Sequence, residues 1–206
     1  MADVRLAQVD EHPFGISWVI DEAGSRASHA LKVEGQVYVI DPVEHEAALE
    51  RIEVLGPVAA VVQLLDRHNR DCAAIARKLG VPHLRMPEAI PNTPLETIRV
   101  VDLRRWREVA LWWPRRELLV VAEALGTASL WTADHGVVGL HPLLRPLPPK
   151  ALRAYRPAHL LTGHGPPVSG PDARDGVEWA YDHARGDLPR LGAMFVRMAR
   201  DAVRKR

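Results

Sequence analysis

Cysteine is nearly absent from this sequence, which contains only Cys72. A single cysteine excludes an intramolecular disulfide and any zinc module built from several cysteines. Net charge is also small, because 27 Lys and Arg residues oppose 26 Asp and Glu residues and leave a formal charge of +1. This balance argues against a dedicated nucleic-acid-binding protein, which usually gathers a basic excess on one face. We therefore expect no nucleic-acid partner.

Long apolar segments are missing as well. No stretch approaches the roughly 20 apolar residues that are needed to cross a bilayer. Residues 1–15 also lack the basic start and apolar run of a signal peptide. We therefore expect a cytoplasmic protein without a membrane partner. Apolar residues still make up 47% of the 206 residues, which is enough to bury a core in one domain of ordinary size.

The first half of the chain carries short apolar runs that are typical of strands. Strands are predicted at 4–9, 15–20, 29–33 and 36–40, with a short hairpin turn at Glu34-Gly35. A helical pattern follows Asp41-Pro42 and stops at Gly56. Residues 58–65 then form a continuous apolar run, as in a strand that is buried on both faces. A short helix at 72–80 and another strand complete a predicted βαβ crossover.

The second half repeats this outline. Strands are predicted at 97–101, 108–113, 117–125 and 159–162, with a turn at 114–116 and a loop-rich region at 127–149. Helices are predicted near 150–155, at 172–185 and from 189 to the end. Two sets of strands, each followed by helices, favour two sheets between helical layers.

Three places combine strand ends with polar side chains that can bind ligands. Residues 64–72 (LLDRHNRDC) lie where a buried strand gives way to a helix, and open α/β sheets usually place their sites there. Glu123 interrupts an apolar run, where a carboxylate is costly unless it is paired or metal-bound. His164 follows another buried strand, and its neighbours Gly163 and Gly165 allow other groups to approach closely.

In these segments the chain resembles the metallo-β-lactamase-fold hydrolases over most of its length. Residues 39–42 (VIDP) resemble the family's early strand with its structural aspartate, and residues 61–82 have the rhythm of its main His-x-His-x-Asp-His motif. Residues 108–127 resemble the second hairpin, and residues 160–168 (LLTGHGPPV) match the late turn. The resemblance implies a single α/β domain over 1–206 with halves at about 1–95 and 96–206. The implied fold is a metallo-β-lactamase-like αβ/βα four-layer sandwich with two mixed β-sheets between helical layers.

The same resemblance indicates that most metal ligands of the family have been replaced. In the best register of the main motif, Arg67 and Asn69 occupy the two leading histidine positions, and His68 is out of phase by one residue. Asp71 keeps the aspartate, and Cys72 stands in place of the last histidine. Further along the chain, the histidine of the second hairpin falls on or near Arg104, Glu123 replaces the bridging aspartate, and His164 retains the final histidine.

A guanidinium has no lone pair for a metal and repels a cation, so we expect the three-imidazole site to be lost. The leading interpretation is a degenerate family member that is not an active metallohydrolase and acts as a binding or structural protein with no cofactor. Arg67 and Arg104 would then pair with Asp71 and Glu123 in a neutral buried network.

Two alternatives remain open. In the first, Asp71, Cys72, Glu123 and His164 hold one zinc or iron ion, and Asp71 acts on a bound water in the hydrolysis of an ester, thioester, lactone or phosphodiester. In the second, a metal-independent enzyme binds a small anionic ligand through Arg67, Asn69 and Arg104.

Other chemically suggestive residues have simpler structural interpretations. Cys72 begins a helix but has no neighbouring histidine in the sequence, so a buried thiol is favoured over a nucleophile. His135 and His141 could line a channel, although structural histidines are commoner. The basic C-terminal segment is expected to form a solvated helix or a homodimer contact rather than a membrane contact.

Overall fold

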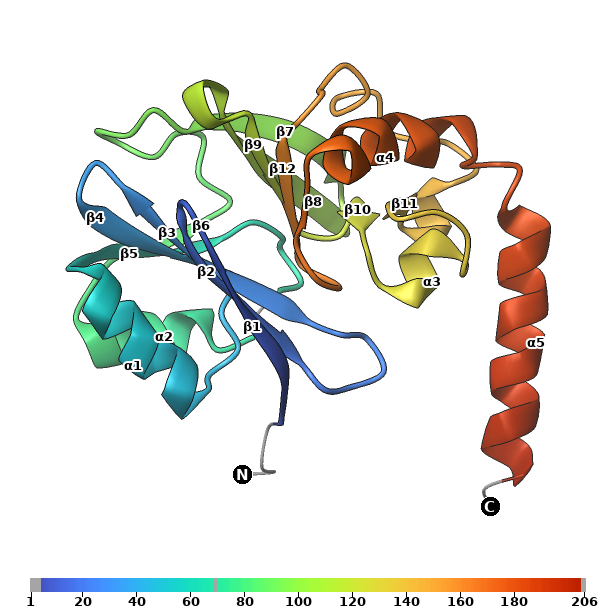
Figure 1. Ribbon diagram of the computed structural model, residues 1–206, viewed down its shortest axis with the longest axis horizontal. Helices are drawn as coiled ribbons and strands as arrows, with labels where there is room; N and C mark the ends of the chain where they lie inside the picture. The colour runs from blue at the N-terminus through green and yellow to red at the C-terminus, as the bar shows by residue number, and fades with distance from the viewer. Residues whose placement is uncertain (1–4, 69, 205–206) are drawn as a thin grey trace.

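The computed structural model describes residues 5–68 and 70–204. Two mixed β-sheets lie face to face, and helices cover their outer faces (Figure 1). This arrangement confirms the two-sheet α/β fold expected from the sequence. Among the described residues, no helix is long and apolar enough to cross a membrane.

The first sheet contains six strands in the order β1-β2-β3-β4-β5-β6. The first four form an antiparallel meander. Strand β5 then pairs with β4, and β6 with β5, both in parallel. The parallel pairing requires the helical crossovers that the sequence predicted. The strands are β1 (Leu6–His12), β2 (Gly15–Ile20), β3 (Ala27–Val33), β4 (Gln36–Ile40), β5 (Val58–Gln63) and β6 (His83–Arg85).

The second sheet contains five strands in the order β13-β12-β9-β8-β7. Only β12 and β9 are parallel, and a separate two-stranded ribbon joins β10 to β11. The strands are β7 (Glu96–Leu103), β8 (Trp106–Trp113), β9 (Leu118–Val121), β10 (Leu125–Gly126), β11 (Gly139–Leu140), β12 (His159–Thr162) and β13 (Val168–Ser169).

Five α-helices complete the described fold. Helices α1 (Glu46–Leu55) and α2 (Cys72–Leu79) bury their apolar faces against the first sheet. Helix α4 (Pro171–Asp182) packs against β11, β12 and β13. Helix α3 (Ser129–Thr132) is a single turn beside the ribbon, and α5 (Leu188–Arg204) ends the described chain. The larger apolar core fills the space between the two sheets.

The two sheets are joined by hydrogen bonds as well as by apolar packing. His29 of β3 is buried, and its ring contacts Ser17 Oγ at 2.7 Å and the carbonyl of Thr162 on β12 at 3.0 Å. Isolated β-bridges connect Arg26 to His164 and Leu65 to Glu108. These contacts fix the carboxyl ends of β5, β9 and β12 next to one another.

The structure differs from the sequence-based expectation in three places. Residues 151–154 form turns rather than the predicted helix, and residues 114–116 form a short 3₁₀ helix at the predicted turn. The expected strand over 117–125 is broken, because β9 ends at Val121 and β10 begins at Leu125. Glu123 therefore lies in the bend between two strands and not within one.

Candidate metal centre

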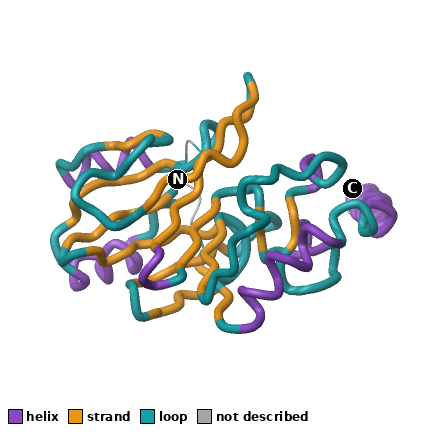
Figure 2. Tube along the Cα trace, turned by 90° about the horizontal axis from the view of Figure 1, so that it is seen from above, coloured by secondary structure: helices purple, strands orange, loops and turns teal. Residues whose placement is uncertain are grey.

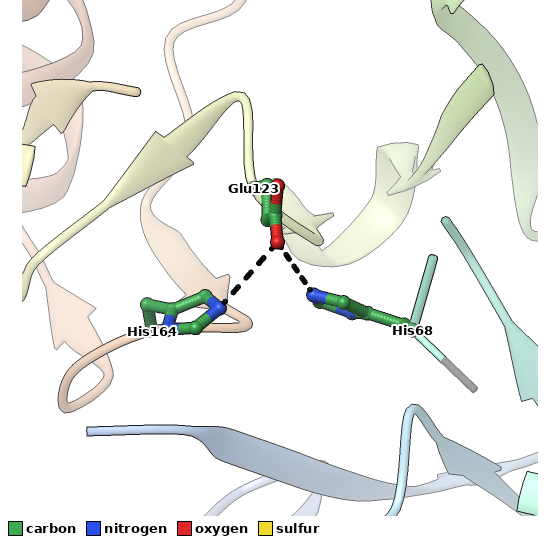
Figure 3. A group of neighbouring side chains, drawn as sticks. All are labelled: His68, Glu123 and His164. Atoms are coloured by element: carbon green, nitrogen blue, oxygen red, sulfur yellow. Dashed lines mark hydrogen bonds and ion pairs between the residues drawn. The ribbon is translucent and has the colours of Figure 1, made fainter. Parts of the chain in front are cut away.

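A carboxylate and two imidazoles from distant parts of the chain meet at the carboxyl ends of three strands. His68 follows β5, Glu123 follows β9, and His164 follows β12. Their ligand-capable atoms all lie within 4.8 Å of one another. The two imidazoles face the same carboxylate oxygen, with His68 Nε2 at 3.3 Å and His164 Nε2 at 3.9 Å from Glu123 Oε1 (Figure 3).

His68 is oriented by Asp41, which lies at the end of β4. The His68 Nδ1 atom is 3.0 Å from Asp41 Oδ2, and the Leu64 amide donates to Asp41 Oδ1 at 3.0 Å. Since an ionised carboxylate only accepts hydrogen bonds, Nδ1 carries the proton. In the neutral ring, Nε2 then presents a lone pair toward Glu123. Such a carboxylate–histidine pair is the usual support of a metal-binding imidazole.

His164 is oriented in a similar way by a backbone group. Its Nδ1 atom lies 2.6 Å from the carbonyl oxygen of Gly24, and a carbonyl can only accept, so Nδ1 carries the proton here too. Trp131 stacks on the other side of the ring, with 4.2 Å between the centroids. Burial and the positive charge of Arg70 lower the pKa of His164. The ring is therefore neutral at pH 7, with the Nε2 lone pair toward Glu123.

Glu123 is held in the bend after β9 by a second, fully buried carboxylate. Glu108 Oε1 accepts hydrogen bonds from the amides of Glu123 and Ala124 at 2.9 and 2.8 Å. Its Oε2 atom accepts from the indole of Trp106 at 3.1 Å. Burial raises the pKa of Glu108 although these hydrogen bonds oppose the shift. Sequence analysis did not single out Glu108, whose only signal is a carboxylate near the middle of an apolar strand.

Two arginines border the three ligand-capable residues. The Arg70 guanidinium is buried in the wall of the site and donates to the carbonyls of Ala27, Asp41 and Gly163 at 2.6, 2.8 and 2.9 Å. Its Nη2 atom is also 3.4 Å from His68 Nε2. Arg67 is more exposed and donates to Glu123 Oε2 at 2.8 Å. Fixed positive charge therefore lies beside both Glu123 and His68.

Aromatic side chains form the rim of the site on the side of Arg67. The Arg67 guanidinium lies 4.1 Å from the ring centroid of Trp106, which is a cation–π contact. His141 packs edge-on against both Trp106 and Trp131, and its Nε2 atom is 3.8 Å from Glu123 Oε2. Burial lowers the pKa of His141. His141 thus lies near the site, as one interpretation of the sequence suggested.

The protonation of the site follows from these contacts. Burial acts to raise the pKa of Glu123, but its hydrogen bond with His68 and the charges of His68 and Arg67 lower it overall. Burial and Arg70 act to lower the pKa of His68, but Asp41 and Glu123 raise it overall. When no other cation lies between the two groups, a proton on His68 Nε2 therefore forms a hydrogen bond to the Glu123 carboxylate.

The structure brings together part of the residue set expected from the sequence. Glu123, His164 and Arg67 lie together. Arg67 pairs with Glu123, but the expected buried network with Asp71 and Arg104 does not form: Asp71 accepts from the Glu44 amide, Arg104 lies in an exposed turn, and the Arg67 side chain is 41% exposed. His68, which the sequence register placed one residue out of phase, points directly into the site. The loop after β5 therefore follows a register shifted by one residue, so that Arg70 also reaches the site.

Asp71 and Cys72 lie apart from this group. Asp71 Oδ2 accepts from the Glu44 amide at 2.8 Å. Cys72, the first residue of α2, is buried, and its Sγ atom is 3.6 Å from the His68 carbonyl. Burial raises the pKa of the Cys72 thiol to about 12, which leaves it protonated. The apolar spacing of Cys72, Ile75 and Ala76 was the sequence signal that places this thiol in the core.

Arg104 does not reach the site. Arg104 is exposed in the tight turn between β7 and β8. Asn69 lies outside the described residues. Among the described residues, Arg67 is therefore the only member of the expected anion-binding set (Arg67, Asn69 and Arg104) that lies at the site.

The donor chemistry of the three-residue group fits one divalent metal. Two imidazole nitrogens and one carboxylate oxygen form a common zinc ligand set, and tetrahedral zinc places its donors about 3.4 Å apart. The separations of 3.3 and 3.9 Å between the imidazoles and Glu123 are close to that value. Within residues 5–68 and 70–204, no second group of three such ligands occurs.

Comparisons with known proteins support the fold at low sequence identity. No protein-family profile matches the chain, and no curated protein matches it in sequence. Among solved structures, DIM-1 metallo-β-lactamase exposed to ceftazidime is 11% identical and has a TM-score of 0.58, covering 88% of this chain and 99% of its own. A metallo-β-lactamase from Pontibacter korlensis is 14% identical and has a TM-score of 0.57, covering 91% and 99%.

A third structure, the metallo-β-lactamase from Erythrobacter litoralis, is 12% identical with a TM-score of 0.56 and covers 89% of this chain and 96% of its own. The match extends over both sheets and almost the whole of each related chain. Identities this low carry information on the backbone arrangement only. Together with the two-sheet topology described above, they show that this chain has the metallo-β-lactamase fold.

Proposed function

We propose that the chain is a single-metal hydrolase in which His68, Glu123 and His164 hold one divalent ion, zinc or iron. One observation carries this proposal: Asp41 and the Gly24 carbonyl orient two imidazoles so that their lone pairs face the same carboxylate oxygen. Three acceptors that face one another repel unless a cation or a proton lies between them. A proton on His68 would leave the lone pair of His164, which burial and Arg70 keep neutral, without a partner, whereas a metal ion would use both imidazoles.

The neighbouring arginines define how this site departs from a two-metal centre. Arg70 places a buried guanidinium 3.4 Å from His68 Nε2, and a guanidinium excludes a cation from the space it fills. In place of a second metal ion, the proposed site would contain the Arg70 guanidinium beside one divalent ion.

The chemistry of a hydrolase divides between the ion and the chain. A bound divalent ion would lower the pKa of a water molecule and polarise the oxygen of a scissile bond. Arg67, whose side chain is 41% exposed, is placed to bind a carboxylate or phosphate group of the substrate. Asp41 and Gly24 keep the imidazoles in the correct tautomer. We therefore propose an anionic ester, thioester, lactone or phosphodiester as the substrate class.

The test is the metal content of the protein and its dependence on the three ligands. Protein purified without chelators is analysed for zinc and iron. Hydrolysis of anionic esters, thioesters, lactones and phosphodiesters is then measured before and after chelator treatment. We expect about one equivalent of metal per chain, lost in Glu123→Gln and His164→Ala. His159→Ala is the matched control, because His159 lies at the opposite end of β12 from His164. Protein without bound zinc or iron, and with unchanged behaviour in the ligand variants, would contradict the proposal.

A second candidate function has an observation of its own. Arg67 and the protonated form of His68 both lie against Glu123, and Arg70 lies beside them, so the charges of the site can balance without a metal. In this state the protein is a degenerate, non-hydrolytic family member that binds a small anion. Binding of inorganic phosphate would then weaken with salt and be lost in Arg67→Ala, whereas Arg104→Ala, in an exposed turn, would leave it unchanged. Elemental analysis separates the two candidates.

A further inference from the structure

Helix α5 is the part of the described chain with the least support from the rest of the molecule. It extends away from both sheets in Figure 1, and Figure 2 shows it nearly end-on at the periphery. Of its 17 residues only Leu191 and Met194 are buried. The body of the protein therefore covers one narrow strip of the helix near its start.

The start of α5 is nevertheless firmly anchored. Asp187, immediately before the helix, is buried. Its carboxylate contacts His135 Nδ1 at 2.9 Å and accepts a hydrogen bond from Arg145 Nη1 at 3.2 Å. Further along, Arg197 pairs with Asp134 at 3.0 Å. The Arg145–Asp187 pair is buried and therefore costly to break, whereas the Arg197–Asp134 pair is exposed. The start of α5 is thus fixed to the body by Asp187.

The part of α5 that the body leaves uncovered carries large apolar residues at helical spacing. We define the apolar face of α5 as its exposed large hydrophobic residues, which are Leu188, Phe195, Val196, Met198 and Val203. The exposed fractions are 47% for Phe195 and 75% for Val203. Single exposed apolar residues are normal, but a contiguous set on one helix usually marks a contact surface.

The opposite side of α5 is basic. Arg190, Arg197, Arg200 and Arg204 share one side of the helix when they are placed at 100° per residue, and Asp201 is the only acidic residue in the helix. From Leu188 to the end of the sequence there are six basic residues and one acidic residue, a net charge of +5, whereas the whole chain has +1. The preceding residues therefore carry a net charge of −4. The positive charge is concentrated on this one segment.

We propose that α5 docks its apolar face on an anionic lipid bilayer, with the arginines at the level of the headgroups. Large exposed apolar side chains opposite a basic side are the pattern of helices that lie in the membrane interface. Each basic residue near an anionic bilayer adds to the attraction. The helix is already formed, so binding does not require it to fold.

Two other partners fit the same residues less well. A second copy that packed its own α5 against this one would place two segments of charge +5 side by side, and like charges at that range repel. Nucleic acid would bind the arginines but would leave Phe195 and Met198 exposed. Sequence analysis expected a solvated helix or a homodimer contact here, because the sequence alone does not show that only Leu191 and Met194 of this helix are buried.

The test is sedimentation of the full-length protein with lipid vesicles. Binding is measured with phosphatidylcholine vesicles and with vesicles that also contain phosphatidylglycerol, at low salt and at about 0.5 M salt, where screening is strong. We expect binding to the anionic vesicles only and its weakening by salt. The double variant Phe195→Ser/Met198→Ser should bind at least about tenfold more weakly, because it removes buried apolar area. Arg200→Gln/Arg204→Gln should show a similar loss.

The matched control is Val54→Ser on α1, since Val54 is 88% exposed but lies on an otherwise polar surface. It should bind like the parent protein, and thermal melting should show that all variants are folded. Equal binding of the parent and both double variants, or absence of binding to anionic vesicles, would overturn the proposal. So would a dimer in analytical ultracentrifugation that becomes monomeric in Phe195→Ser/Met198→Ser, because the face would then be occupied by a second copy.

Discussion

Single side chains decide the electrostatics of the candidate metal centre. Asp41 and Gly24 fix the protons of two imidazoles on the side away from Glu123. Arg70 and Arg67 add permanent positive charge next to the same group. The site thus differs from one made only of neutral and acidic ligands, because it keeps partial charge balance without an ion. Whether an ion binds depends on how well each of these side chains is held.

Glu108 gives the clearest prediction at this scale. Its carboxylate is the acceptor for three donors, from the Glu123 and Ala124 amides and the Trp106 indole. In Glu108→Ala these buried donors lose their acceptor, and each such loss costs about 1–3 kcal/mol. We expect the free energy of unfolding, measured by urea denaturation, to fall by about 3 kcal/mol. Metal retention should decrease as well, because the bend that carries Glu123 is released.

The control for this variant is Glu88→Ala. The Glu88 side chain is 92% exposed and pairs only distantly with Arg99 at 3.8 Å. Its removal should change the free energy of unfolding by less than about 0.5 kcal/mol. Equal effects of the two substitutions would show that Glu108 does not hold the bend.

At the scale of the secondary-structure elements, the turn after β12 determines where His164 lies. Gly165 has a φ of +93° and lies against Ala128 and Thr127, so an added Cβ would overlap the Ala128 amide nitrogen and Thr127 Oγ1. Gly170 has a φ of +66° but has open space around its Cα. Substitution of Gly170 therefore measures the cost of positive φ alone, whereas substitution of Gly165 adds the cost of steric overlap.

We predict that Gly165→Ala is much more harmful than Gly170→Ala. An alanine at positive φ costs about 1 kcal/mol, which is all that Gly170→Ala should lose. Gly165→Ala adds overpacking of about 1–3 kcal/mol and displaces the turn that carries His164. Thermal melting and metal content measure the two effects. Similar melting temperatures for the two variants would contradict the close packing of this turn.

Two histidines with lowered pKa values, His29 and His12, predict a loss of stability in acid. Burial lowers the pKa of His29 to about 3 and that of His12 to about 4, against 6.5 in the unfolded chain. The unfolded state thus binds more protons below pH 6.5, so stability is complete above that pH and is lost as the pH falls toward 4 and 3. Each histidine contributes a slope of about 1.4 kcal/mol per pH unit in that range.

His29→Gln tests this linkage. The variant removes one of the titrating histidines, so its free energy of unfolding should fall less steeply between pH 6 and pH 4, by about 1.4 kcal/mol per pH unit. At pH 7 it should be less stable than the parent, because the contact with the Thr162 carbonyl changes. Urea denaturation at several pH values measures both. A slope identical to that of the parent protein would exclude His29 as a source of acid sensitivity.

Sequence analysis predicted most elements because their patterns are local. The run 58–65, the helix starting at Cys72 and the strand before His164 are recognisable from apolar spacing alone. The site was only partly predictable, because the positions of His68 and Arg70 depend on contacts with Asp41, Ala27 and Gly163. These partners are far apart in sequence, so a one-residue shift in an irregular loop leaves no local signal.

At the scale of the whole molecule, the site exists only when both sheets are in place. His68 follows a strand of the first sheet, whereas Glu123 and His164 follow strands of the second. The Arg70 guanidinium also bonds both sides, through the carbonyls of Ala27 and Gly163. Neither half of the chain could therefore assemble the ligand group alone.

We predict that the two sheets unfold together. Trp18 reports on the first sheet and Trp113 on the second, and both are buried. Because Trp18 is the only tryptophan in residues 1–95, the fluorescence of Trp18→Phe reports on the second half of the chain alone. It should give the same urea midpoint as far-UV circular dichroism, which reports on both sheets. Two separated transitions would show that the halves are independent, in conflict with the bridges at Arg26 and Leu65.

The buried guanidinium of Arg70 has one more consequence, which concerns what a chelator can remove. An ion held by side chains exchanges with the solution, but the charge of Arg70 belongs to the covalent chain and stays after extraction of the ion. In the proposed hydrolase, stripped protein would therefore still attract negatively charged molecules to the site, although it could no longer cleave them. Occupancy by ligand and turnover, which disappear together in many metalloenzymes, would then be separable.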